Sequence, residues 1–275
     1  GHRRRSLRHR QPRQHGRHLP QCRGLRRQRR PPRQRLLRSA LPEGDPGQGA
    51  AQFPHGTQAG GEAFDGHVLP QAGAVLAEET AAREGLSAEA ADTFILGDPI
   101  DGTREFLKRT GDFTVNIALV HKRRPVAGAV FAPARDALFV GGASALSWSG
   151  FAPGEKTADR KARQLRSRPY PAAGLIAVTS ASHLDPDTVA FLERTRVAGR
   201  TGIGSSLKFC LLAQGEADVY PRWGTTMEWD TAAGQAVLEA AGGMVATPQG
   251  APLIYGKADK GFRNGPFIAW GRRPI

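Results

Sequence analysis

The alternation of hydrophobic and polar residues divides the chain into two unlike regions. From about residue 74 onward, short apolar runs recur between glycine, proline and charged residues, a pattern typical of short strands and helices. Before residue 70, apolar residues are sparse and follow neither the strand period of about 2 nor the helix period of about 3.6. The pattern therefore predicts no regular elements over residues 1–70 and a folded domain over 71–275.

The first half of the folded region is predicted to be rich in strands. Residues 72–80 indicate a short buried strand that ends in acidic residues, and 94–96 a strand that runs into a turn. Segments 113–120 and 125–133 are β-rich and joined by a polar link, which predicts an antiparallel hairpin. We further expect a loop or short helix over 80–92, a short strand over 137–142 and weak patterning over 143–168.

The second half is predicted to alternate between strand and helix. Residues 174–181 indicate an apolar strand. Asp185 followed by Pro186 marks a helix start, because Asp caps the first turn and proline fits the first helical position. Two further helices are expected, one from Ser205 or Ser206 to Gly215 and one from Asp230 to Gly242 and Gly243.

The net charge of +14 comes from one segment. Residues 1–40 contain 15 Arg, no Lys and no acidic residue, whereas residues 41–275 carry 24 basic and 25 acidic side chains. The Arg/Pro/Gly-rich residues 1–70 have three interpretations: a disordered segment, a basic arm that binds nucleic acid, or the translation of a shifted reading frame. A nucleic-acid partner is disfavoured because no aromatic residues lie between the arginines.

Two further features bear on the cellular setting. Cys22 and Cys210 are too few for a disulfide framework and suit a reducing compartment. No run approaches the roughly 18 apolar residues of a membrane-spanning helix, and no apolar stretch follows the basic N-terminus as it would in a secretory signal. We therefore expect no integral membrane segment.

The strongest chemical signal is the sequence Asp98-Pro99-Ile100-Asp101-Gly102-Thr103. Its two carboxylates straddle a turn after an apolar strand, and the Ile100 carbonyl can face the same point. Such hard oxygen ligands suit Mg²⁺ better than a soft metal. The backbone N–H groups of Gly102 and Thr103, at a helix start, suit a phosphate. The plainer alternative is an ordinary turn, since Asp and Gly favour turns without any chemistry.

Two other acidic positions follow the same logic. Glu78 and Glu79 end an apolar run, although adjacent acids usually form a solvated loop. Asp230 begins an Ala/Gly-rich helix, where Asp is most often only an N-cap. Taken together with Asp98 and Asp101, these positions predict a carboxylate cage.

The residues that carry this chemistry resemble the inositol monophosphatase-like, magnesium-dependent phosphatases. The DPxDGT signature stands at 98–103 and the WDxAAG signature at 229–234. Within that family, the stretches 97–120, 204–222 and 229–243, and the closing Tyr255 to Asn264 region, resemble the bacterial CysQ-type 3′(2′),5′-bisphosphate nucleotidases. The resemblance covers about residues 74–270. It implies a layered αβαβα sandwich, with an antiparallel sheet from 74–150 and a second α/β half from 170–270.

The resemblance also implies roles for matching residues. Two or three Mg²⁺ ions would be held by Glu78, Asp98, the Ile100 carbonyl, Asp101 and Asp230. Catalysis would depend on Glu78, Asp101 and Thr103, and the scissile phosphate would lie against Gly102 and Thr103. The substrate would contact these groups together with His183, Ser205, Lys208 and Arg222, the last three near a 5′-phosphate. A solvated helix face is the alternative for Lys208, and a surface histidine for His183.

The implied reaction is removal of the 3′-phosphate of 3′-phosphoadenosine 5′-phosphate to give AMP and phosphate, in sulfate assimilation, with inhibition by Li⁺. Such an enzyme is cytoplasmic, either free or peripheral on the inner membrane. The alternatives are an inositol monophosphatase, a fructose-bisphosphatase-like phosphatase, or an inactive chain. The last stays open because the family's Thr-x-x-Asp element is not found in residues 1–70.

Overall fold

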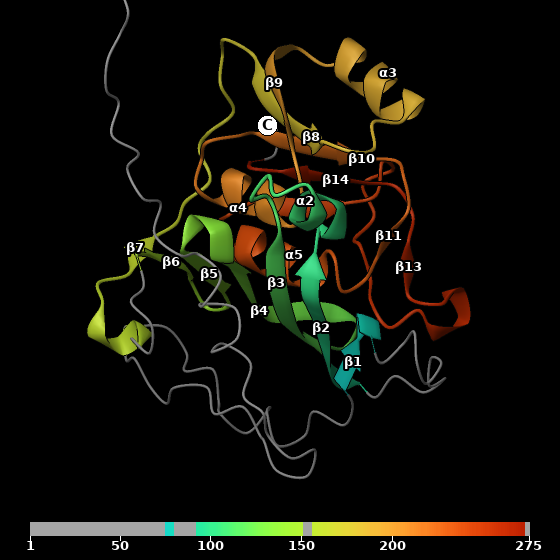
Figure 1. Ribbon diagram of the computed structural model, residues 1–275. Helices are drawn as coiled ribbons and strands as arrows, with labels where there is room; N and C mark the ends of the chain where they lie inside the picture. The colour runs from blue at the N-terminus through green and yellow to red at the C-terminus, as the bar shows by residue number, and fades with distance from the viewer. Residues whose placement is uncertain (1–74, 80–91, 151–155, 273–275) are drawn as a thin grey trace, which may run out of the picture. The chain divides into compact units, whose positions relative to one another are not determined.

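Figure 1 shows the computed structural model of the chain, which describes residues 75–79, 92–150 and 156–272. The chain divides into two compact units, residues 1–57 and 58–275, and every described residue belongs to the second. The expectations for residues 1–70, and nearly all of the loop or helix expected over 80–92, lie outside the described residues. The domain boundary at residue 70 stays a prediction.

Seven strands form the first sheet and follow one another in chain order. All neighbours pair antiparallel except β1 and β2, which run parallel. The hairpin predicted over 113–133 is confirmed as β3 and β4, and the strand over 137–142 as β5. The strands are Val75–Ala77 (β1), Thr93–Asp101 (β2), Thr114–His121 (β3), Arg124–Ala132 (β4), Ala137–Gly141 (β5), Ala145–Ser149 (β6) and Arg163–Gln164 (β7).

The weakly patterned region 143–168, for which no element was predicted, contains β6 and β7, which are too short to show a clear period in the sequence. One expectation for this sheet is wrong. The strand over 72–80 was expected to be buried, but β1 has three residues and Val75 is 63% exposed. β1 lies at the edge of the sheet, where a strand has a neighbour on one side only.

The second sheet is mixed and has the strand order β12-β14-β10-β8-β9. The predicted strand over 174–181 is confirmed as β8, which runs parallel to β9 and β10. β14 pairs antiparallel with β10 and β12. The strands are Leu175–Ser180 (β8), Val197–Ile203 (β9), Val219–Arg222 (β10), Met244–Ala246 (β12) and Phe267–Trp270 (β14), and a separate two-stranded ribbon joins Thr226–Met227 (β11) to Arg263–Asn264 (β13).

Among the described residues, α3, α4 and α5 complete the layers (Figure 1). α4 and α5 lie between the two sheets, and α3 covers the outer face of the second sheet. The layered α/β sandwich expected from the sequence is thereby confirmed for the described residues. The helices are Thr103–Leu107 (α2), Pro186–Arg194 (α3), Leu207–Ala213 (α4) and Ala232–Ala240 (α5), with short 3-10 turns at Pro133–Arg135 (η2), Thr157–Asp159 (η3) and Ala258–Lys260 (η4).

The N-cap residues of α3 and α4 are those predicted from the sequence, whereas that of α5 is not. Asp185 caps α3 by accepting a hydrogen bond from Thr188 N at 2.8 Å, as predicted. Ser206, one of two candidates, is the N-cap residue of α4. Asp230 is not the N-cap of α5, because Thr231 occupies that position. The carboxylate of Asp230 is thereby left for another role.

The helix α5 packs directly on the first sheet because two strand positions lack a side chain. A Cβ at Gly141 would lie 2.4 Å from Cα of Val237, and one at Gly128 would lie 2.8 Å from Cα of Ala233. Both distances are far below van der Waals contact. The close approach buries one continuous core between the sheets, to which β2, α4, α5 and β14 all contribute. This core fixes where α5 begins, and so where Asp230 lies.

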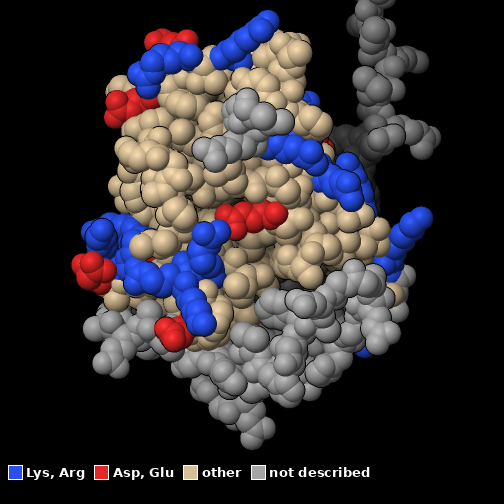
Figure 2. Space-filling view, turned by 180° about the vertical axis from the view of Figure 1, so that it is seen from behind, with Lys and Arg blue, Asp and Glu red and all other residues tan. Residues whose placement is uncertain are grey.

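The surface of the described region carries mixed charge. On the face seen in Figure 2, basic and acidic side chains lie next to one another in several groups, with uncharged surface between the groups. This agrees with the near balance of acidic and basic residues after residue 40. Among the described residues, no helix has the length and apolar character needed to cross a membrane.

Candidate functional site

A β-bulge brings Asp98 and Asp101 to the same side of β2. Asp98 pairs with Asn116 of β3 and Asp101 with Thr114, so one extra residue is inserted between them. In a regular strand, residues three apart point to opposite faces, but a bulge re-aims one of them. The sequence predicted a turn here. In the structure the strand instead continues to Asp101, and the bulge, not a turn, brings the two carboxylates together.

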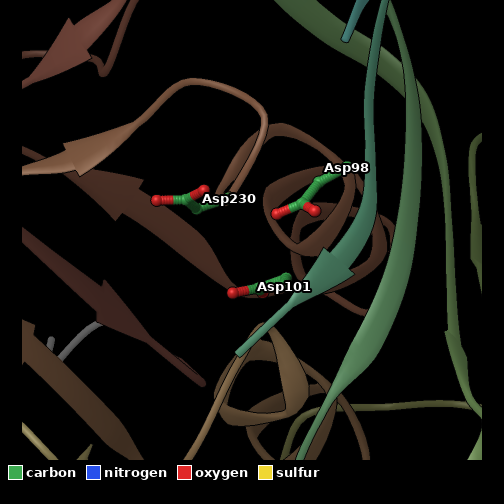
Figure 3. A group of neighbouring side chains, drawn as sticks. All are labelled: Asp98, Asp101 and Asp230. Atoms are coloured by element: carbon green, nitrogen blue, oxygen red, sulfur yellow. The ribbon is translucent and has the colours of Figure 1, made fainter. Parts of the chain in front are cut away.

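Asp230 joins these two carboxylates from the other half of the fold. Oxygens of Asp98, Asp101 and Asp230 all lie within 4.8 Å of one another. Figure 3 shows the three side chains around a shared space, two from β2 and one from the loop before α5. One oxygen of Asp230 accepts a hydrogen bond from Met227 N at 2.8 Å, which fixes the carboxylate relative to that loop. The three Asp residues predicted for the cage are therefore neighbours.

Asp101 is held by a set of donors that engage one oxygen. Its Oδ2 accepts hydrogen bonds from Ser206 N at 2.6 Å, Asn116 Nδ2 at 3.1 Å and Thr114 Oγ1 at 3.3 Å. The Ser206 hydroxyl lies 2.9 Å from the same oxygen. Because the lone pairs of Oδ2 are taken, Oδ1 is the atom left to bind a ligand. Neither Asn116 nor Ser206 was predicted to have this role.

The cluster is electrostatically unfavourable as long as it holds only carboxylates. Burial, together with the nearby charges of Asp101 and Asp230, raises the pKa of Asp98 to about 9. Burial also raises the pKa of Asp230 to about 7, again with a contribution from Asp101. Among the described residues, no Lys or Arg forms an ion pair with these three carboxylates. Converging hard oxygens without a protein counter-ion fit a divalent cation.

Glu78 lies beside this group without being part of it. It is exposed, directly after β1, and its side chain forms a hydrogen bond with Asp98. Burial raises its pKa above the usual value, and the charges of Glu79 and Asp101 add to the rise. The structure thus brings together three of the four predicted carboxylates and places the fourth in contact with one of them.

The turn after Asp101 carries the residues predicted to contact phosphate. Gly102 has φ 88°, in the left-handed region that favours glycine, and it is the N-cap residue of α2. The hydroxyl of Thr103 lies 3.3 Å from the Ile100 carbonyl oxygen. Because α2 has only five residues, a phosphate contact here would depend on local N–H groups more than on a helix dipole.

A cavity of about 220 Å³ adjoins the carboxylates. The predicted substrate contacts His183, Ser205, Lys208 and Arg222 all line it, together with Asp101, Gly102, Thr103 and Asp230. Tyr220 and Phe209 supply apolar wall. The structure therefore gathers residues from 101 to 231 of the sequence around one opening, whereas Glu78, Asp98 and Ile100 do not line it.

Arg104 is a pocket residue that the sequence reasoning did not identify. It lines the same cavity, and its Nη1 lies 2.8 Å from Nε2 of His183. Burial lowers the pKa of His183, and the charges of Arg104 and Arg222 lower it further, so the imidazole is neutral at pH 7. The sequence could have indicated this residue, because Arg104 is a cation that directly follows the predicted metal and phosphate segment 98–103.

Lys208 is buried and not on a solvated helix face. Its ammonium donates to the carbonyl oxygens of Ser205 and Ile203 and lies 5.1 Å from the centre of the Tyr220 ring. Burial lowers its pKa to about 8. Two of its three N–H groups thus hold the loop before α4, which leaves the third for a ligand in the cavity.

This chain is similar in sequence and in fold to several other proteins. The 3′(2′),5′-bisphosphate nucleotidase CysQ of Escherichia coli (strain K12) is 45% identical over 160 residues, which are 58% of this chain and 61% of that protein. CysQ of Buchnera aphidicola (subsp. Acyrthosiphon pisum) is 40% identical over 182 residues, 65% of this chain and 64% of that protein. The crystal structure of CysQ from Bacteroides thetaiotaomicron superposes with a TM-score of 0.62 at 39% identity, over 73% of this chain and 77% of that one.

The matched part of the chain thus spans about three fifths of the curated relatives' length. A model of the inositol monophosphatase family matches residues 67–266, which is more than half of the chain. That range includes all the residues that form the carboxylate cluster and the adjoining cavity. The chain therefore belongs to the inositol monophosphatase family.

Proposed function

We propose that this protein is a magnesium-dependent 3′(2′),5′-bisphosphate nucleotidase that converts 3′-phosphoadenosine 5′-phosphate to AMP and phosphate. The observation that carries the proposal is the mixed charge of the cavity lining. Carboxylates of Asp101, Glu105 and Asp230 line the cavity together with three cations, Arg104, Lys208 and Arg222. Among the described residues, these three cations form no ion pair with a carboxylate. A substrate with two separate phosphates would match this arrangement.

Asp98, Asp101 and Asp230 would hold the metal ions, with Glu78 and the Ile100 carbonyl completing the ligands. The fit rests on oxygens that converge within 4.8 Å without a protein counter-ion. Bound Mg²⁺ supplies Lewis-acid stabilisation of phosphate charge and lowers the pKa of a coordinated water. Asp98 and Asp230, whose pKa values are raised to about 9 and about 7, would lose their protons when the ions bind.

The residues near the turn would position the nucleophilic water. The Thr103 hydroxyl is directed at the Ile100 carbonyl, so its oxygen lone pairs remain to accept a hydrogen bond from water. Glu78, beside Asp98, would accept the second hydrogen bond and take the proton. Attack on phosphorus then breaks the bond to the ribose 3′ oxygen, which takes a proton from solvent water.

The cations that line the cavity would hold the phosphate that is not cleaved. Arg222 donates to the Gly224 carbonyl through Nε, which leaves part of its guanidinium for a ligand. Arg104 and Lys208 would approach the same phosphate from α2 and α4. The neutral His183 would lie beside the adenosine, with Ser205 at the phosphate. Inositol monophosphate has a single phosphate and would leave these cations without an anion.

Steady-state kinetics test the proposal. The purified chain is assayed with 3′-phosphoadenosine 5′-phosphate, inositol 1-phosphate and p-nitrophenyl phosphate, with and without Mg²⁺ and with millimolar Li⁺. We expect Mg²⁺-dependent and Li⁺-inhibited release of phosphate, with kcat/KM for the adenosine bisphosphate at least about a hundredfold above that for inositol 1-phosphate. A preference for inositol 1-phosphate would assign the chain to the other branch of the family. Absence of all hydrolysis would favour the inactive-chain alternative.

A further inference from the structure

A buried polar network adjoins Asp230 and includes Thr231, which also lines the cavity. The carboxylate of Asp230 is anchored by Met227 N at 2.8 Å. Met227 ends the short strand β11, which pairs with β13 through Thr226–Asn264 and Met227–Arg263. The position of Asp230 thus depends on how the backbone of Met227 is held. A two-stranded ribbon alone does little to hold it.

Asn264 binds the other backbone polar group of the same residue, the Met227 carbonyl. It is 2% exposed, and its Nδ2 donates to the Met227 carbonyl at 3.1 Å and to the Thr231 hydroxyl at 2.9 Å. Thr231 is the N-cap residue of α5 and directly follows Asp230. One amide group therefore holds the residue that donates to Asp230 and the residue next to it.

The orientation of the Asn264 amide is set in turn by a buried ion pair. Lys257 Nζ lies 3.0 Å from Asn264 Oδ1 and 2.7 Å from Glu228 Oε1. Because the ammonium only donates, Oδ1 must face it, and Nδ2 must face the Met227 carbonyl. Glu228 is fully buried, and its carboxylate also accepts from Gly256 N at 2.6 Å and Lys257 N at 3.0 Å.

We propose that Asn264, oriented by the Lys257–Glu228 pair, is a positioning residue that holds Asp230 in the geometry needed to bind metal. The inference rests on the proposed function in one respect, namely that Asp230 is a metal ligand. Groups that orient a ligand from behind typically affect metal affinity or activity by about 10- to 100-fold. The plainer alternative is a network that only stabilises the loop 254–264. That alternative predicts a lower melting temperature and an unchanged metal affinity of the folded protein.

Direct measurement of Mn²⁺ binding distinguishes a positioning role of Asn264 from a purely stabilising one. Asn264→Asp keeps the volume and the acceptor for Lys257 but removes the donor to Met227, and Asn264→Ala removes both. Ser167→Ala is the matched control, because it deletes one buried hydrogen bond, to the Ala241 carbonyl, just after the other end of α5. Mn²⁺ dissociation constants are measured by calorimetry or electron paramagnetic resonance on full-length protein, beside thermal melting curves.

We expect both Asn264 variants to bind Mn²⁺ about tenfold or more weakly than wild type, and Ser167→Ala to bind it normally. Unchanged affinity in a folded Asn264→Asp protein overturns the inference, as does an equal loss in the control. If Asn264→Ala does not fold, Asn264→Asp alone decides. Wild-type protein that binds Mn²⁺ but hydrolyses no phosphomonoester would refute the proposed function and leave the inference standing. Wild-type protein that binds no Mn²⁺ overturns both.

Discussion

Ser206 N donates a hydrogen bond of 2.6 Å to Oδ2 of Asp101, although the two residues are 105 positions apart. Asp101 ends a strand of the first sheet, and Ser206 occupies the N-cap position of the helix α4 between the sheets. The Ser206 hydroxyl also lies 2.7 Å from the carbonyl oxygen of Asp230. One serine thus links the carboxylate of Asp101 to the backbone of Asp230, in the other half of the fold.

Because of this contact, replacing Ser206 and replacing its neighbour Ser205 should change different kinetic constants. Ser206→Ala should lower kcat about tenfold with little change in KM for substrate, because Asp101 keeps its amide donor but loses the hydroxyl beside it. Ser205→Ala should chiefly raise KM, since Ser205 lines the cavity without contacting the carboxylates. Steady-state kinetics on both variants check this division. A rise in KM alone for Ser206→Ala would contradict it.

Replacement of Asp98 should separate activity from stability. Asp98→Asn is expected to reduce Mg²⁺-dependent hydrolysis by more than about a hundredfold, since several kcal/mol of metal-based stabilisation are lost. The metal-free protein should melt at a higher temperature than wild type, because a buried carboxyl whose pKa is raised to about 9 is replaced by a neutral amide. Phosphate release and thermal melting measure the two effects. Unchanged turnover would remove Asp98 from the metal centre.

The acidic residues of the site could be predicted from the sequence, but the residues that hold them through hydrogen bonds could not. The signatures at 98–103 and 229–234 named the acidic residues, because each motif is continuous in the chain. Asn116 and Ser206 hold Asp101 from remote segments, and no local pattern marks a residue whose role depends on tertiary pairing. The strand β9 was not predicted either, because VAGRTGI has no apolar run and is ordered by its neighbour β8.

Arg104 and Lys208 should discriminate between substrates with one and two phosphates. Lys208→Ala and Arg104→Ala are each expected to raise KM for 3′-phosphoadenosine 5′-phosphate about tenfold or more, because each removes a cation that lines the cavity. The KM for p-nitrophenyl phosphate, which lacks the second phosphate, should change by less than about twofold. Arg135→Ala is a control, since Arg135 pairs with Asp112 and does not line the cavity. Equal effects on both substrates would place either residue outside the second phosphate site.

Metal affinity should rise with pH. In the metal-free protein the pKa is raised to about 9 for Asp98 and about 7 for Asp230, so both sites release protons when a cation binds near neutral pH. Mn²⁺ affinity should increase by up to about tenfold per pH unit for each proton released between pH 6 and 9. Calorimetry in two buffers of different ionisation enthalpy counts those protons. A pH-independent affinity over this range would contradict the raised pKa values.

The same groups set the sign of the pH dependence of stability. Their unfolded pKa values are near 3.8, so each group stabilises the metal-free fold fully below that pH. The stabilisation is lost as pH rises, through about 7 for Asp230 and about 9 for Asp98. Denaturant unfolding of metal-free protein should therefore give a decreasing free energy of unfolding from pH 5 to 9. Added Mn²⁺ should oppose that decrease, because it binds the ionised carboxylates of the folded state.

The contact of α5 with the first sheet should tolerate no side chain at Gly141. Gly141→Ala would place its Cβ 2.4 Å from Cα of Val237 in the helix backbone, so strand and helix must move apart. We expect a loss of about 3 kcal/mol in the free energy of unfolding and weaker Mn²⁺ binding, since the start of α5 carries Asp230. Gly142→Ala is the matched control, because its Cβ would meet no atom closer than 4.0 Å. Denaturant titration and Mn²⁺ calorimetry measure both variants. Equal stability of the two proteins would show that the sheet and α5 are not in rigid contact.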